Sequence, residues 1–202
     1  MDLPSATYRL QLDPAQMDLA AAAELVPYLD QLGVSHVYVS PLLRSRPGSP
    51  HGYDTVDPGL IDPQLGGRTG LDRMVTALHD HGMRLILDVV PNHMAIGQHN
   101  PWWMDVLENG PKADHSGHFD LFWDDDGLSL PLLGRPYVEA LDAGELTIGI
   151  EGGAVRVAYW DERFPLSAES LRSAGLDAAD PEIHARIAAI NADHRRIASA
   201  SR

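Results

Sequence analysis

Hydrophobic and polar positions in the first part of the chain switch between the period of a strand and the period of a helix. Apolar and β-branched residues predict short strands at 8–12, 34–40 and 85–88. Apolar residues three and four positions apart predict helices at 18–32 and 69–82. The order strand–helix–strand–helix–strand is typical of parallel strands joined by helical crossovers, so the predicted fold class is α/β.

Local signals refine where the helices begin. Pro27 lies inside the first helical pattern and would cost about 3 kcal/mol in an uninterrupted helix, so we expect a kink or a restart there. Thr69 and Asp72 have the spacing of a capping box, which predicts that the second helix begins at Thr69. A last helix is expected from Asp180-Pro181 onward, with isoleucines on one face.

Two long connections interrupt this pattern. Residues 41–68 are rich in proline and glycine and predict one long loop, and such a loop inside a compact domain is usually functional. After Asn92 the chain is expected to stay irregular up to Asp142. The segments 146–150 and 155–159 then predict a β-hairpin that turns at Gly152-Gly153.

The acidic composition limits the partners that we expect. The chain has a net charge of −14, with 44% hydrophobic and 22% charged residues. Nucleic-acid binding needs a basic surface, so no nucleic-acid partner is expected. No apolar run reaches about 18 residues and no signal-peptide pattern is visible, so we expect no membrane partner and a cytoplasmic location. There is no cysteine, which excludes disulfides and thiolate metal ligands.

Both a doubly wound sheet and a β/α barrel begin with this order of elements. No GxGxxG or GxxxxGK[ST] motif follows a predicted strand, so a nucleotide-binding sheet would lack its phosphate-binding loop and the barrel is favoured. Polar side chains at the C-terminal end of a barrel strand face the active site. Asp88, Asn92 and His93 occupy such an end. The alternative is a strand followed by a proline turn, with a histidine that only satisfies its own hydrogen bonds.

The first long loop contains His51-Gly52-Tyr53-Asp54, a second candidate site. A tyrosine ring can stack on the apolar face of a sugar, while histidine and aspartate can hydrogen-bond sugar hydroxyls. The alternative is that these residues only shape the turn, with Asp54 capping a backbone group.

Adjacent tryptophans, Trp102 and Trp103, could also form a sugar-stacking platform, or one of them could fill a gap in the core. The nearby histidines do not have the spacing of a zinc motif, so we expect no metal site and read them as solvated loop residues. They are His93, His99, His115 and His118.

Several motifs together resemble one family. They are YRLQL at 8–12, YLDQLGVSH at 28–36, SP at 40–41, HGYD at 51–54, LGG at 65–67, DVVPNHM at 88–94, NPWW at 100–103, DVLENG at 105–110, LPLLG at 130–134 and PY at 136–137. The chain resembles the maltooligosyltrehalose synthase family, a branch of the α-amylase superfamily (glycoside hydrolase family 13) of (β/α)8 barrels. The DVVPNH motif alone indicates only the superfamily, whereas NPWW and DVLENG beside HGYD indicate the trehalose-forming branch.

The resemblance implies that the enzyme isomerises the reducing-end α-1,4 linkage of a maltooligosaccharide to an α,α-1,1 linkage, with retention. It implies that His51 and Tyr53 line the sugar subsite, that His93 binds a hydroxyl of the same sugar, and that Asp54 contributes to substrate binding. Asp88 and Asn92 would support the site. No cofactor is expected, including the calcium ion that related amylases bind.

The chain departs from the family pattern in ways that affect the expected activity. Met104 stands where the family tends to have a third tryptophan, and Phe122 stands where we expect an acid. Retaining glycosyl transfer needs two carboxyl groups, one of them in an Arg-x-Asp strand end in this superfamily, and no such strand follows His93. We therefore expect an N-terminal portion of the barrel that lacks the catalytic pair and has the remaining part of the barrel as a possible partner.

These considerations predict three regions. The first β/α units of the barrel, with about three strands, are expected at 1–93, an inserted subdomain with the hairpin at 94–180, and a C-terminal helix at 181–202. Two other functions stay open: a fragment of an α-amylase-type glucan hydrolase, and a non-catalytic maltooligosaccharide-binding protein.

Overall fold

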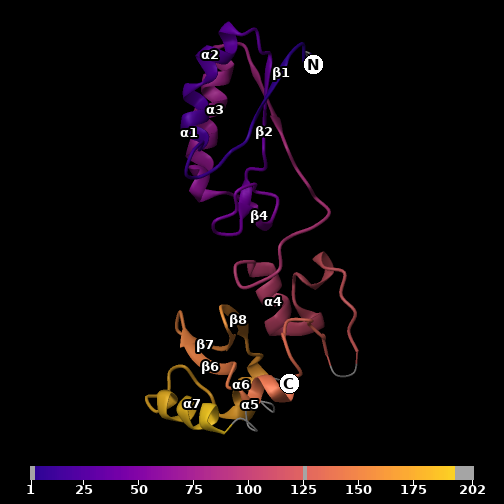
Figure 1. The fold of residues 1–202 in the computed structure, drawn as a ribbon, viewed down its shortest axis with the longest axis vertical. Coiled ribbons are helices and arrows are strands. Elements are labelled where there is room, and N and C mark those ends of the chain that lie inside the picture. The colour runs from indigo at the N-terminus through magenta and orange to yellow at the C-terminus, as the bar shows by residue number, and fades with distance from the viewer. Residues whose placement is uncertain (1–2, 125–126, 194–202) are drawn as a thin grey trace. The chain divides into compact units, whose positions relative to one another are not determined.

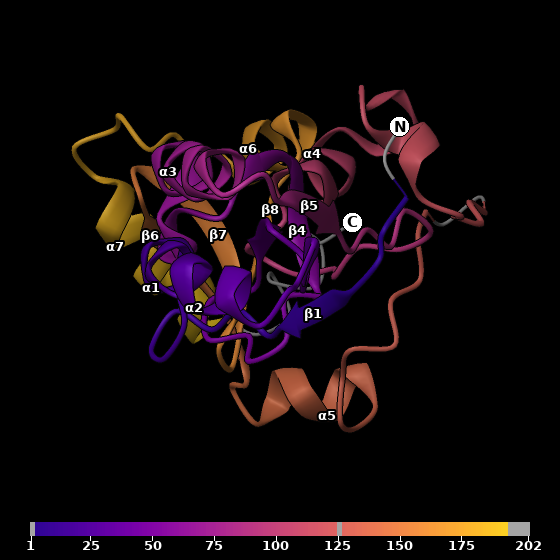
Figure 2. The same ribbon diagram turned by 90° about the horizontal axis from the view of Figure 1, so that it is seen from above.

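The computed structural model describes residues 3–124 and 127–193. It divides into two compact units, Met1–His99 and Asn100–Arg202, which are described separately (Figures 1 and 2). The predicted boundaries after residues 93 and 180 stay predictions about the organisation of the chain.

The first unit is built on a three-stranded parallel sheet. Its strands are β1 (Thr7–Leu10), β2 (His36–Val39) and β5 (Arg84–Leu87), in the order β1-β2-β5. Both pairs are parallel, and their register places Leu10 beside Val39 and Val39 beside Leu87. The parallel α/β arrangement predicted from the sequence is confirmed.

Helices cover one face of this sheet (Figure 1). They are α1 (Leu19–Glu24), α2 (Val26–Gln31) and α3 (Gly67–Asp80). The strands contribute Leu10, Val37 and Val39 to the core that they share with these helices. From the helices, Leu19 and Met74 are fully buried in the same core. Burial of these apolar side chains is the main stabilising contribution of this unit.

Proline and glycine decide where these helices begin. The expected restart at Pro27 is confirmed, because α1 ends before Leu25 and Pro27 lies in the first turn of α2, where its missing N–H costs nothing. The capping box predicted at Thr69 is wrong. The third helix begins at Gly67 after a left-handed Gly66, and Asp72 instead pairs with Arg68 at 2.9 Å.

The predicted long loop at 41–68 contains regular structure, which corrects the prediction. Strands β3 (Leu43–Ser45) and β4 (Thr55–Ile61) form an antiparallel pair, and the 3-10 helix η1 (Pro63–Leu65) follows them. Pro58 lies within β4, which is tolerated because a two-stranded sheet has only edge strands. The pairing shifts register on both sides of Arg44, so the alternation that identifies a strand from its sequence is broken.

The second unit begins with a helix in a region predicted to be irregular. Helix α4 (Pro101–Asn109) is followed by η2 (Gly110–Lys112), η3 (Ser116–His118) and α5 (Tyr137–Asp142). The prediction for residues 92–142 is therefore wrong in part. Asn100-Pro101 is a helix start signal, since asparagine is a good N-cap and proline suits the first helical position.

A three-stranded antiparallel sheet follows in this unit. Its strands are β6 (Leu146–Glu151), β7 (Ala154–Tyr159) and β8 (Glu162–Pro165), in the order β6-β7-β8. The hairpin predicted around Gly152-Gly153 is confirmed, whereas β8 was not predicted. Helix α6 (Ala168–Ala174) comes next in the chain.

The last described helix, α7 (Ile183–Ala192), begins at Ile183 instead of at the predicted Asp180-Pro181, and it packs on this sheet through the predicted isoleucine face. Ile183, Ile187 and Ile190 are buried in one core with β6 and β7. Residues 194–202 of the predicted helix lie outside the described residues. None of the described helices combines the length and the apolar character that crossing a membrane requires.

We expect the start of α4 to depend on Asn100. Its buried side-chain oxygen accepts hydrogen bonds from the backbone N–H groups of Trp102 (2.9 Å) and Trp103 (3.0 Å). Asn100→Ala should lower the free energy of unfolding of the second unit by about 1–2 kcal/mol. All four tryptophans lie in this unit, so their fluorescence during urea unfolding reports on it. Asn100→Ser keeps a capping oxygen and should lose much less, and equal losses in both variants would contradict the capping role.

Candidate functional site

The face of the parallel sheet away from the helices carries polar side chains at its C-terminal end. Arg9 of β1 is the register partner of Tyr38 of β2, so the two side chains share that face. Asp88 comes directly after β5, and its backbone N–H extends the ladder by donating to the carbonyl of Val39 at 3.2 Å. The neighbours Leu10 and Val39 point to the opposite, helix-covered face.

Asp88 is the centre of a hydrogen-bond network on this face. Its Oδ2 accepts a hydrogen bond from the hydroxyl of Tyr38 and another from the hydroxyl of Tyr53, each at 2.6 Å. Arg9 Nη2 donates to the Tyr53 hydroxyl oxygen at 3.1 Å. The Arg9 guanidinium also lies 5.5 Å from the centre of the Tyr38 ring, within the range of a cation–π interaction.

This network favours a charged Asp88. The hydrogen bond from Tyr38, then the one from Tyr53, and the nearby charge of Arg9 lower the pKa of Asp88 below its ordinary value. The same interaction raises the pKa of Tyr38, because ionised Asp88 disfavours a second negative charge beside it. Asp88 is therefore an anion that holds two tyrosines as donors, and an acid that releases protons near neutral pH does not fit this geometry.

Tyr53 is held in a fixed orientation by these contacts. Its hydroxyl donates to Asp88 and accepts from Arg9, so the ring face is the part of the side chain that remains available to a ligand. The ring of His51 lies 5.9 Å from the ring of Tyr53. The Tyr53 backbone N–H donates to His51 Nδ1 at 3.0 Å, and Gln11 Nε2 donates to the His51 carbonyl at 3.4 Å. Arg9 of β1 and Gln11, just after this strand, thereby anchor the turn that carries both rings.

The turn between these rings requires a glycine. Gly52 has a φ of 76°, a conformation that side-chain-bearing residues avoid. A Cβ at this position would lie 3.2 Å from the carbonyl oxygen of Pro41, which leaves almost no room for a side chain.

Asp54 has contacts that shape the same turn. It accepts a hydrogen bond from the hydroxyl of Ser49, whose oxygen also accepts from the Gly52 backbone N–H at 3.1 Å. His51 Nδ1 lies 3.8 Å from the Asp54 carboxylate. These contacts favour the turn-shaping alternative for Asp54, and its contact with substrate stays a prediction.

His93 and Asn92 contact each other at the end of the third parallel strand. His93 Nδ1 and Asn92 Oδ1 are 3.0 Å apart, and both residues are exposed. Among the described residues, this is the only hydrogen bond of the His93 side chain, and none links it to Tyr53. The meeting of His51, Tyr53 and His93 on one sugar therefore stays a prediction.

The tryptophan pair lies in the second unit, at the start of α4. Trp103 is 4% exposed and its ring packs on that of Phe119 at 5.3 Å, so it is a core residue in this unit. Trp102 is partly exposed and stacks on His115, with ring centres 4.9 Å apart, while His118 lies 4.6 Å from it. The stacking prediction therefore rests on Trp102.

Of the histidines near Trp102, His115 is partly buried, which differs from the expected solvated residue, whereas His118 is exposed as expected. His115 Nδ1 lies 2.7 Å from the carboxylate of Asp105. This contact, followed by a hydrogen bond from Asn109, lowers the pKa of Asp105. No group of three or more potential metal ligands occurs among the residues that the structure describes.

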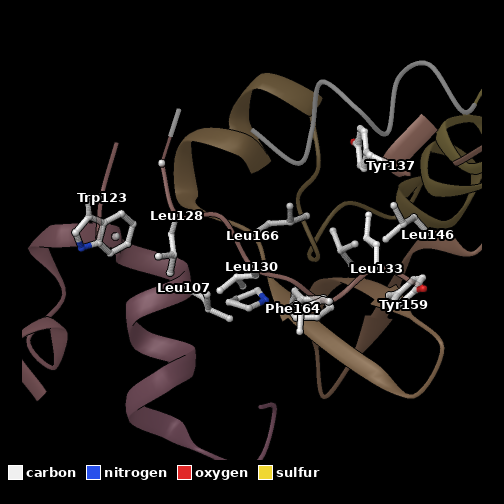
Figure 3. Close-up of a pocket in the computed structure, with 15 residues that line it drawn as sticks. Leu107, Trp123, Leu128, Leu130, Leu133, Tyr137, Leu146, Tyr159, Phe164 and Leu166 are labelled. Carbon is white, nitrogen blue, oxygen red and sulfur yellow. The ribbon is translucent and has the colours of Figure 1, made fainter. Parts of the chain in front are cut away.

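The second unit also contains a cavity of about 460 Å³ (Figure 3). Leucines and aromatic rings line it, and none of its lining residues is charged. In Figure 3, Leu130, Phe164 and Leu166 lie in the middle of the view, and Tyr137 and Tyr159 line the cavity on the right. A sugar needs several polar partners for its hydroxyls, so this apolar cavity is a poor candidate for the substrate site.

Sequence reasoning did not single out Arg9 and Tyr38. Both are visible in the sequence as polar or amphipathic positions that alternate with the buried Leu10, Val37 and Val39. Their meeting depends on the register of β1 against β2, which a pattern within one strand does not give.

The pKa of Asp88 should respond to removal of either tyrosine hydroxyl. Tyr38→Phe and Tyr53→Phe should each raise it toward the ordinary value, because each removes a donor that stabilises the carboxylate. A carbon-detected NMR titration of the side-chain carboxyl measures this change. Tyr28→Phe, at an exposed position on α2, is the matched control and should leave the pKa unchanged.

The sign of the pH dependence follows from the lowered pKa. A folded-state pKa below the unfolded value stabilises the fold at pH above the unfolded pKa, and this stabilisation is lost as the pH falls through the folded value. Acid should therefore destabilise the wild-type chain more than Asp88→Asn. An equal acid sensitivity of the two proteins would contradict the role of this carboxylate.

Comparison with known proteins places these features in one family. The family model for the alpha amylase catalytic domain matches residues 14–128, more than half of the chain. A putative maltooligosyl trehalose synthase of Mycobacterium tuberculosis is 37% identical over 188 residues, which is 89% of this chain and 23% of that protein. An intracellular maltogenic amylase of Bacillus subtilis is 39% identical over 104 residues, 52% of this chain and 17% of that protein.

The solved structures agree with the sequence comparison. Maltooligosyltrehalose synthase from Arthrobacter ramosus is 39% identical, with a TM-score of 0.71 over 83% of this chain and 22% of that chain. The chain thus spans about a quarter of the length of these synthases. The expected fold class is confirmed, as a partial α/β unit of the α-amylase barrel type. The chain therefore belongs to the family of alpha amylase catalytic domains.

Proposed function

We propose that this chain is the N-terminal part of an enzyme that converts the reducing-end α-1,4 linkage of a maltooligosaccharide to an α,α-1,1 linkage, a step of trehalose formation. Its similarity to maltooligosyl trehalose synthases extends over 89% of the chain, well beyond the part that matches the maltogenic amylase. This extent favours the isomerising enzyme over an α-amylase-type hydrolase.

The orientation of Tyr53 is the observation that carries the proposal. Both polar functions of its hydroxyl are used by Asp88 and Arg9, so binding of a ligand falls to the ring face. The ring of a glucose unit has an apolar face that suits stacking on an aromatic ring. Because the tyrosine does not have to be ordered when the sugar arrives, its fixed position lowers the entropic cost of binding.

The other candidate residues have roles that follow from their chemistry. In this proposal His51, beside Tyr53, and the exposed His93 bind hydroxyls of the sugar, while Asp54 holds the turn that carries His51 and contributes to substrate binding. Asp88 and Asn92 support this site in the first unit, and Trp102 is a stacking residue of the second unit. The proposed site uses no metal ion and no cofactor.

The proposed contribution of this chain is binding, not bond cleavage. No Arg-x-Asp sequence follows His93, and the lowered pKa of Asp88 makes it a structural anion. The catalytic carboxylate pair would come from the part of the barrel that its relatives have beyond the matched region. A cytoplasmic location belongs to the same proposal, and the related Bacillus subtilis amylase is described as intracellular.

We expect the chain to bind maltopentaose through Tyr53. Tyr53→Ala removes the ring and should weaken the affinity measured by calorimetric titration about tenfold, while Tyr53→Phe keeps the ring but loses its anchor and should weaken it less. The control Tyr28→Ala removes an exposed ring on α2 and should not change the affinity. Equal affinities of wild-type and Tyr53→Ala proteins would refute the stacking role.

The same sample tests the absence of catalysis. After incubation with maltohexaose, the number of reducing ends should stay constant. A fall in reducing ends would show that this chain itself isomerises the substrate, and shorter reducing sugars would show hydrolysis. Either result would contradict the proposed division between binding and catalysis.

A further inference from the structure

The two turns of the antiparallel sheet in the second unit differ in the residues that adopt a positive φ. Gly152 and Gly153 connect β6 to β7 with φ values of 58° and 79°. Glycine is the residue expected in such a two-residue turn, because only glycine adopts these angles without strain. Trp160 and Asp161 connect β7 to β8, and here Trp160 has a φ of 50°.

Trp160 therefore occupies a position that favours glycine. A two-residue turn in which only the first residue has a positive φ is of the type that usually places glycine there. Trp160 is the only non-glycine residue with a positive φ in the described part of the chain. A bulky side chain in this conformation is unfavourable by itself, so a tryptophan at this position needs a compensating role.

Packing does not supply that compensation. The side chain is 69% exposed, although tryptophan has one of the largest apolar surfaces to bury. Its ring is nearly perpendicular to that of the buried Tyr159, with centres 6.5 Å apart, and most of the indole stays exposed beside this contact. The exposed ring is thus maintained at a cost in both backbone strain and solvation.

The turn that presents this ring is well anchored. Arg163 Nη1 donates to the carbonyl oxygen of Trp160 at 2.8 Å, and Arg163 Nε donates to the Glu151 carboxylate at 2.9 Å. These bonds tie the turn between β7 and β8 to the neighbouring strands. A rigid aromatic side chain loses little conformational entropy when a ligand stacks on it.

The charges around the ring restrict the ligand. Asp161 and Glu162 follow Trp160 directly in the chain, Glu151 is paired with Arg163, and the whole chain has a net charge of −14. An anionic ligand such as a nucleic acid or an acidic lipid surface would be repelled. A neutral polyhydroxylated ligand is favoured, because carboxylates accept hydrogen bonds from hydroxyls and the indole face covers an apolar sugar face.

We infer that Trp160 is a sugar-stacking residue of the second unit that binds α-glucan chains, an inference that rests on the proposed function. The ring takes one glucose unit on its exposed face, and Glu162 beside the turn accepts a hydrogen bond from a sugar hydroxyl. The binding surface needs no cavity, which suits a long flexible chain better than a single small sugar.

The experiment follows the indole N–H signals of the four tryptophans by NMR while maltoheptaose is added. The signal that is missing in Trp160→Phe identifies Trp160, and it should shift during the titration. Trp160→Asn should weaken the affinity for maltoheptaose about tenfold, as followed by the backbone N–H signals of the turn. Asparagine tolerates a positive φ but cannot stack on a sugar. Phe122→Ala, another exposed aromatic residue of the second unit, is the matched control and should leave binding unchanged.

Thermal unfolding separates binding from a structural role. Because Trp160→Asn relieves an unfavourable conformation, the melting temperature should stay constant or rise. A fall of more than about 4 °C would show that the ring stabilises the fold and would overturn the inference. An unshifted Trp160 signal at saturating maltoheptaose would overturn it as well.

The Tyr53→Ala variant distinguishes this inference from the proposed function. If Trp160 binds glucan, its signal still shifts in Tyr53→Ala, even though the contribution of Tyr53 is lost. If only the Tyr53 variant affects binding, the proposed function stands and the inference about Trp160 fails. If maltoheptaose shifts Trp160 while Tyr53→Ala changes nothing, the proposed role of Tyr53 fails instead.

Discussion

The carboxylate of Asp88 is the constraint on which the candidate site depends. One of its oxygens accepts hydrogen bonds from two tyrosine hydroxyls that come from different elements, β2 and the turn before β4. It thereby joins the end of one parallel strand to its neighbour and to the turn. Since the turn itself contains no buried apolar cluster, the position of Tyr53 depends on this anion and on Arg9.

In this arrangement one residue fixes the geometry of the site and another contacts the ligand, two tasks that are often combined in one residue. The Oδ2 atom of Asp88 holds both tyrosine hydroxyls and the lowered pKa keeps the group ionised, while the face of the Tyr53 ring that it fixes is left for a ligand. A site of this kind is pre-organised before the substrate arrives. In the proposed function, it gives a chain that contributes no catalytic pair a defined geometry for stacking on a sugar.

The sequence predicts those parts of the fold that follow a regular period. The parallel strands, the restart at Pro27 and the hairpin at Gly152-Gly153 are all confirmed. The strands β3 and β4 were missed because Pro58 and irregular pairing disguise the alternation, and α4 was missed although Asn100-Pro101 signals its start.

Among the site residues, Asp88 and Tyr53 could be found from the sequence because they lie in motifs at a strand end and in a turn. Arg9 and Tyr38 could not, since their contact depends on strand register.

The start of α4 is capped by the side chain of Asn100. Two backbone N–H groups at the helix start are satisfied by Asn100, the first residue of the second unit. The first turn of α4 is therefore encoded locally, within the four residues Asn100-Pro101-Trp102-Trp103.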